Sequence, residues 1–150
     1  MIAQDSGSRL NESHLAMGLA RLEAGHGDPL AALDYVTLAI RNYQDSGSTI
    51  QVRASLAVPA ILLDRLGRYE SAASIVGFAV VSPMTAATVP EIGTAIAHLR
   101  AVLGDSTYES LARKGETMTT AAMTTYAYDQ IDQPRTELEH AERLDHSKQS

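Results

Sequence analysis

An internal repeat constrains this chain more than any other feature of its sequence. Residues 27–36 align with residues 67–76, and Ala39 then falls on Ala79. The period is that of a two-helix repeat. Because a single helix pair cannot bury both of its faces, repeated pairs stack on one another and form a continuous core. The repeat therefore predicts an α-solenoid.

Apolar spacing and turn residues predict an all-α chain of about six or seven antiparallel helices. Leu15, Leu19 and Leu22 fall on one helical stripe, the pattern of a core-facing helix. Asp28 is the expected N-cap of the next helix, with Pro29 at its first position. The expected helices cover residues 10–24, 29–46, 49–66, 69–81, 89–103, 107–115 and 117–131.

The third of these helices is expected to lie at the centre of the fold, because apolar residues mark two of its faces. Pro59 should kink it, since proline removes one backbone hydrogen bond. Ser48, Thr88 and Ser106 begin capping-box patterns, and glycines end several of the helices. Residues 82–87 are expected to form a loop.

Composition and charge bound the organisation and exclude several classes of function. We expect a disordered N-terminus over residues 1–8, one helical repeat domain over 9–132, and a polar tail over 133–150 that is a frayed helix or disordered. The chain has no cysteine and a formal charge of −6, which argues against disulfides, a zinc finger and nucleic-acid binding. With no signal segment or membrane span, the chain is expected to be cytoplasmic.

One stretch of the chain resembles a degenerate tetratricopeptide repeat. The small residues Ala60 and Ala72 stand where that family lets two helices approach closely. The residues that carry the resemblance are Leu56, Pro59, Ala60, Leu63, Gly67, Tyr69, Ala72, Val76, Ala79 and Pro83.

A wider resemblance covers most of the chain. Residues 26–29, 39–43, 64–70, 103–105, 108–109, 115–119 and 126–127 are similar to the C-terminal helical region of large actinobacterial signalling ATPases, known as LuxR-type or adenylate-cyclase-linked regulators. This resemblance implies a sensor or scaffold arm. It carries over no active site, because the chain has no phosphate-binding G-x-x-x-x-G-K-[ST] stretch and no basic DNA-reading module.

No residue pattern predicts catalysis, a cofactor site or a metal site. His14 and His26 are interpreted as solvated or helix-end residues, and His98 as a boundary residue of an amphipathic helix. The acid–histidine pairs of the tail lack the convergent ligands that a metal needs. We therefore expect a protein that is not an enzyme and that holds no metal or cofactor.

The expected function is protein binding by a regulatory scaffold. Aromatic anchors dominate many interfaces, so Tyr35, Tyr43, Tyr69 and Phe78 are the predicted contact residues, on the interpretation that they are exposed near helix ends. For Tyr69 the alternative is ordinary packing within the repeat. The partner is expected to be a protein of unknown identity or a second copy, since a short solenoid has two unfinished ends. The alternative is a small ligand bound between helices, where Pro59 and Gly77 would open space.

Overall fold

The computed structural model describes residues 15–20, 22–23, 27–45, 47 and 49–149, and this part of the chain is helical with no strand. Residues 15–20 and 22–23 form a first helical segment. The helices that follow are α2 (Pro29–Asp45), α3 (Thr49–Ser55), α4 (Ala57–Arg65), α5 (Tyr69–Ala79), α6 (Pro83–Thr88), α7 (Ile92–Leu103), α8 (Asp105–Glu116) and α9 (Thr120–Gln149). The all-α prediction is confirmed.

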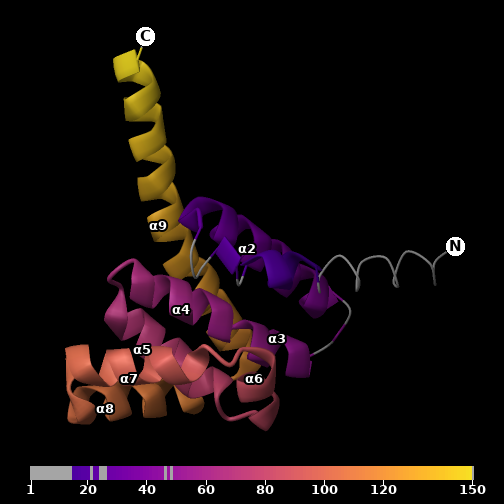
Figure 1. Ribbon diagram of the computed structural model, residues 1–150. Coiled ribbons are helices and arrows are strands. Elements are labelled where there is room, and N and C mark those ends of the chain that lie inside the picture. The colour runs from indigo at the N-terminus through magenta and orange to yellow at the C-terminus, as the bar shows by residue number, and fades with distance from the viewer. Residues whose placement is uncertain (1–14, 21, 24–26, 46, 48, 150) are drawn as a thin grey trace, which may run out of the picture.

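The helices pack partly on their neighbours in the chain and partly on more distant helices, and α9 contacts α2, α3, α4 and α5. Helix α2 contacts α3 and α4, α4 contacts α5, and α5 contacts α7 and α8. In Figure 1, α7 and α8 lie at one end of the body and α2 lies at the other. Helix α9 packs against α2 and α5, and its C-terminal half rises beyond α2, away from the rest of the chain (Figure 1).

Local signals set several helix boundaries as expected. The Asp28 carboxylate accepts the backbone N–H of Leu30 at 3.0 Å, and α2 begins at Pro29. Three glycines adopt positive φ angles that other residues rarely tolerate, and they follow or precede helices as predicted: Gly47, Gly67 and Gly104. The expected cap at Ser106 is wrong, because α8 already begins at Asp105 and has no side-chain cap.

The expected central helix is two helices, α3 and α4, that meet at Leu56. Pro59 has no N–H to donate to the Ser55 carbonyl, so the hydrogen-bond ladder breaks there. The chain restarts at Ala57, which places Pro59 in the first turn of α4, where a missing N–H costs little. The expected kink is therefore present as a break. Ala57, Val58, Ala60, Leu62 and Leu63 are all buried, so the central position of this segment is confirmed.

Two other expectations are corrected. The expected loop at residues 82–87 contains α6, whose first residue is Pro83, a position where proline is well tolerated. Gly77 does not open a ligand space, because the backbone of α8 at Ala112 occupies the volume that a side chain there would need.

The polar tail continues α9 as helix through Gln149. The expectations for residues 1–8, His14, His26 and the cap at Ser48 lie outside the described residues. None of the helices in the described part of the chain is long and apolar enough to cross a membrane.

Candidate functional site

Two of the four predicted contact aromatics are not available to a partner. Phe78 is 0% exposed and Tyr43 is 3% exposed, so the expectation of exposure is wrong for both. The Arg53 guanidinium lies 4.1 Å from the centre of the Phe78 ring and covers it. Tyr35 and Tyr69 are half-buried and pack against the core. Partner binding by these two residues stays a prediction.

The first helical segment presents Leu15 and Leu22 to solvent rather than to the core, while Leu19 is half-buried. Leu15 and Leu22 are each 66% exposed, the highest values among large apolar side chains in the described residues. The small face of the same helix, with Ala16 and Ala20, is buried instead. The sequence stripe is thus real, but its outward direction is the reverse of the expected one.

The outer face of α2 continues this exposed region with both signs of charge. Asp34, Leu38, Arg41 and Asp45 recur at helical spacing and are all exposed, with Leu38 at 37%. The opposite face of α2 is buried in the core. Within the described residues, the outer face of α2 is therefore not covered by another helix.

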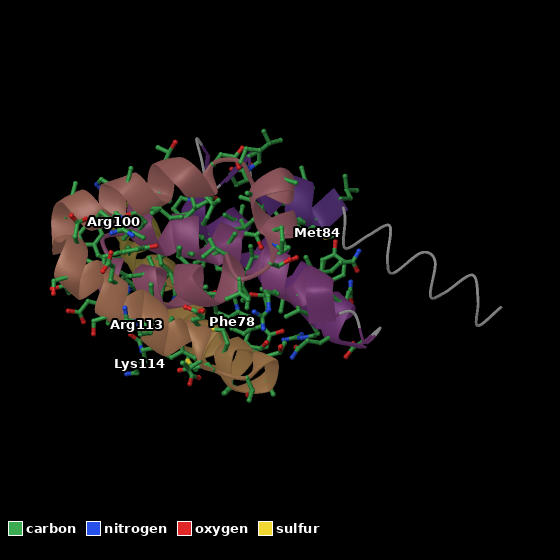
Figure 2. All side chains as sticks on the ribbon, turned by 90° about the horizontal axis from the view of Figure 1, so that it is seen from below. Phe78, Met84, Arg100, Arg113 and Lys114 are labelled. Atoms are coloured by element: carbon green, nitrogen blue, oxygen red, sulfur yellow. The ribbon has the colours of Figure 1, made fainter. Side chains whose placement is uncertain are left out.

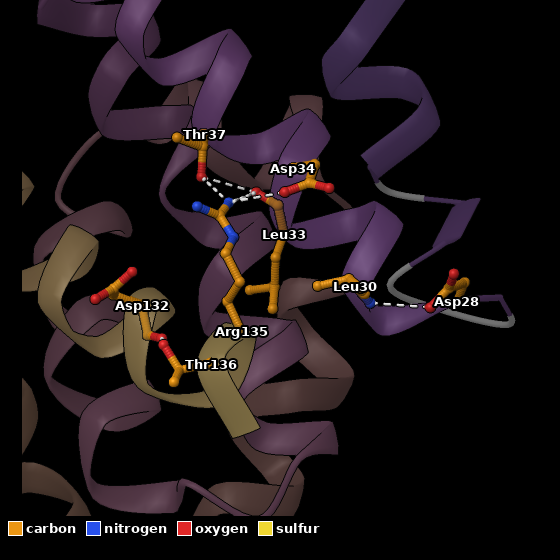
Figure 3. Close-up of polar contacts among 8 residues, drawn as sticks. All are labelled: Asp28, Leu30, Leu33, Asp34, Thr37, Asp132, Arg135 and Thr136. Atoms are coloured by element: carbon orange, nitrogen blue, oxygen red, sulfur yellow. Dashed lines mark hydrogen bonds and ion pairs between the residues drawn. The ribbon is translucent and has the colours of Figure 1, made fainter. Parts of the chain in front are cut away.

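Helix α9 contacts the side of α2 mainly through one arginine, Arg135. Figure 3 shows Arg135 directed at α2, where its Nη2 donates to the Leu33 carbonyl at 3.1 Å and to the Thr37 hydroxyl at 2.8 Å. The same nitrogen lies 3.1 Å from the Asp34 carboxylate. The Arg135 Nε is buried without a hydrogen-bond partner. A second tie runs from the Tyr128 hydroxyl to the Gln44 side chain at 2.9 Å.

Beyond these ties, α9 leaves the body. Every side chain from Glu139 to Leu144 is exposed, and Leu144 is 50% exposed. We call the first helical segment, the outer face of α2 and residues 139–149 of α9 together the open end. It holds four large apolar side chains that are exposed: Leu15, Leu22, Leu38 and Leu144.

A second, smaller apolar patch lies where α5 meets α6. Val80, Val81 and Met84 are 41%, 48% and 48% exposed. Figure 2 places Met84 well away from Arg113 and Lys114, which line a polar hollow along α8. That hollow is lined by surface side chains such as Ser106 and Ser110, so it offers a ligand no apolar wall.

A cleft of about 430 Å³ lies between α4 and α7. His98 Nδ1 lies 2.7 Å from Asp64 Oδ1, and the Asp64 side chain is only 11% exposed. The Tyr69 ring meets the His98 ring edge-on, with 5.8 Å between centroids. The residues lining the cleft are Ile61, Asp64, Arg65, Glu91, Thr94, Ala95 and His98.

The sequence predicted only that His98 lies at the boundary of an amphipathic helix, whereas the structure pairs it with Asp64. The spacing of the two residues, on separate helices 34 positions apart, gave no local signal for this pair. When Nδ1 of a neutral imidazole donates to a carboxylate, Nε2 has a lone pair that can accept a hydrogen bond from a ligand. No group of three or more histidine, aspartate or glutamate side chains in the described residues could hold a metal ion.

Comparison with protein-family models, with curated proteins and with solved structures finds no match to this chain.

Proposed function

We propose that this chain is a non-enzymatic interaction module, a tetratricopeptide-like α-solenoid that binds another protein through its open end. One observation carries the proposal: Leu15 and Leu22 on the first helical segment that the structure describes are each 66% exposed. Burying a leucine side chain stabilises a complex by roughly 1.5–3 kcal/mol relative to leaving it in water.

The resemblance to the helical region of signalling ATPases supports a role as a cytoplasmic sensor or scaffold arm. In that role the partner is a protein, and neither DNA nor a membrane is its target. The formal charge of −6 favours the same choice, because nucleic-acid affinity depends on neutralising phosphates with cations.

The proposal is tested by affinity capture from native lysate with mass spectrometry. The bait is the wild-type chain, the double variant Leu15→Glu/Leu22→Glu, or the control Val102→Glu. Val102 is 45% exposed and belongs to α7, outside the open end. Circular dichroism confirms that each bait is folded.

We expect captured proteins, or captured copies of the chain, to be retained by wild type and by Val102→Glu and lost with the leucine variant. Capture that is unaffected by both leucine substitutions would show that the open end is not the binding surface.

A second candidate function is supported by the cleft beside His98. Its volume of about 430 Å³ lies within the range of small-molecule sites, which is roughly 300–1,000 Å³. Ile61 and Ala95 supply apolar wall, and the imidazole supplies one oriented polar atom. We propose a small regulatory ligand, with an apolar body and one hydrogen-bond donor, as the occupant.

A thermal-shift screen with nucleotides and metabolites tests this second candidate. A true ligand raises the melting temperature of wild type but not of Thr94→Phe, whose ring would fill the cleft from an exposed position. The matched control is Thr107→Phe, an exposed threonine of α8 outside the cleft. A shift that survives Thr94→Phe would place the ligand elsewhere.

A further inference from the structure

We infer that the occupant of the open end is a second copy of this chain, docked end to end about a twofold axis. The inference rests on the proposed function and names its partner. A twofold axis in the plane of the end face, perpendicular to α2, sets α2 antiparallel to α2 of the second copy. The same axis sets the two first helical segments against each other.

The charge pattern on α2 is complementary to itself in this arrangement. Asp34 and Arg41 are exposed on the same face, with Leu38 between them. In an antiparallel pairing whose axis crosses α2 between Thr37 and Leu38, Arg41 faces Asp34 of the second copy, and the pair occurs twice because of the symmetry. Asp45 then lies opposite Leu30, at the start of α2. Asp34 also contacts Arg135 of its own chain, but its side chain is still 63% exposed.

The first helical segment is also complementary to itself in shape. Gly18 lies on the exposed face with Leu15 and Leu22, and nothing comes within 4 Å of the position that its side chain would take. The two leucines are projections on this face and Gly18 is a gap. An identical helix running the opposite way, centred between Gly18 and Leu19, sets Leu15 against Leu22 of the second copy. The missing side chain at Gly18 lets the two helices approach closely.

The area that a stable dimer needs explains the role of α9. A standard interface covers about 800 Å² on each partner, roughly a tenth of the 8245 Å² exposed surface of this chain. The leucines alone fall short of this area, so the outer face of α2 and the C-terminal part of α9 must contribute.

The part of α9 that projects beyond the body is longer than the diameter of one helix. At 1.5 Å per residue, residues 139–149 extend about 16 Å beyond the body. A helix with its side chains is about 10 Å across. The projecting part of α9 is therefore long enough to flank α2 of a second copy stacked on the open end.

Sedimentation equilibrium over a wide concentration range is the first test. The chain has a mass of 16.0 kDa, so a dimer has twice that mass. We expect wild type and Val102→Glu to form the dimer, and Leu15→Glu/Leu22→Glu to raise the dimer Kd about a hundredfold. Wild type that is monomeric at every concentration would overturn the inference.

A charge-exchange experiment tests the geometry. Arg41→Glu and Asp34→Lys each place two like-charge pairs across the axis, and each should raise the dimer Kd about tenfold or more. Asp34→Lys also breaks the ion pair with Arg135 of its own chain, so circular dichroism checks that this variant is folded. Mixing the two variants creates two opposite-charge pairs, so a mixed dimer should form. A variant that had merely misfolded gives no mixed dimer. Failure of the mixture to associate, with both variants folded, would overturn the proposed axis.

The two proposals fail in different ways. If the chain is a monomer and the leucines still govern capture of another protein, the binding surface stands and the second copy is excluded. If the leucine variant alters neither mass nor capture, the open end itself is excluded.

Discussion

Gly77 and Gly115 let α5 and α8 pack with their backbones in contact. A side chain at Gly77 would collide with Ala112, and one at Gly115 would collide with the backbone of Ser74. Each helix therefore contributes one glycine to the same close approach. The backbone on the other side cannot yield as a flexible side chain can.

We predict that Gly115→Ala lowers the free energy of unfolding by about 1–3 kcal/mol, the usual cost of overpacking. Gly93 is the matched control, because it is an exposed glycine in α7 with nothing within 4 Å. Gly93→Ala should instead stabilise by about 0.5–1 kcal/mol, through helix propensity. Urea unfolding measures the free energy of unfolding of both variants. Equal effects at the two positions would contradict the close backbone packing of α5 against α8.

Arg135 is the residue that most directly couples the last helix to α2. We predict that Arg135→Met destabilises by about 1–2 kcal/mol, since a charged donor to a carbonyl and a hydroxyl is lost. A double-mutant cycle with Thr37→Val should give a coupling of at least about 0.5 kcal/mol. Arg143→Met, on the exposed part of α9, is the control and should change stability by less than about 0.5 kcal/mol.

At the scale of the helix, local chemistry predicted starts and stops well. Asp28, Pro29 and the positive-φ glycines act on the backbone within a few residues of themselves, so their effect can be predicted without knowing which helices pack nearby. The predicted loop at residues 82–87 is wrong because proline is found both just after the end of one helix and at the first position of the next. Whether an apolar helix face points into the core or toward solvent could not be predicted from such local signals.

The first helical segment and α5 show why candidate sites are harder to predict. Leu15 and Phe78 are both large and apolar, yet one is exposed and the other is buried. The difference lies in which helix happens to cover each face, and that is set by segments distant in sequence. The Asp64–His98 pair was missed for the same reason.

Removing residues 139–150 should change the free energy of unfolding by less than about 0.5 kcal/mol, because the side chains from Glu139 to Leu144 touch solvent rather than the core. The measurement belongs in the Leu15→Glu/Leu22→Glu background, where association does not contribute. A large loss there would mean that the projecting part of α9 stabilises its own chain.

At the scale of the whole molecule, burial affects three tyrosines in separate parts of the fold. Burial raises the pKa of Tyr43, Tyr108 and Tyr128 above the ordinary value of 10.0. Near pH 10 the folded chain therefore binds these protons more tightly than the unfolded chain does. The resulting stabilisation is present below pH 10 and is lost as the pH rises through 10 toward the folded pKa values.

We predict that the urea midpoint is steady near pH 8 and falls above about pH 10. Tyr108→Phe, which removes one of the ionising groups, should make this fall shallower. An unchanged pH dependence in Tyr108→Phe would show that its burial is not maintained in solution.

The contact between Arg135 and Leu33 joins positions 102 residues apart. A ribosome adds roughly 5–20 residues per second, so about 5–20 seconds separate the emergence of α2 from that of its fastener. During that interval the flank of α2 that α9 will cover is bare. In each newly made molecule, α2 is therefore synthesised before the contact between Arg135 and Leu33 can form. A chaperone or a neighbouring nascent chain can bind the uncovered flank of α2 during this interval.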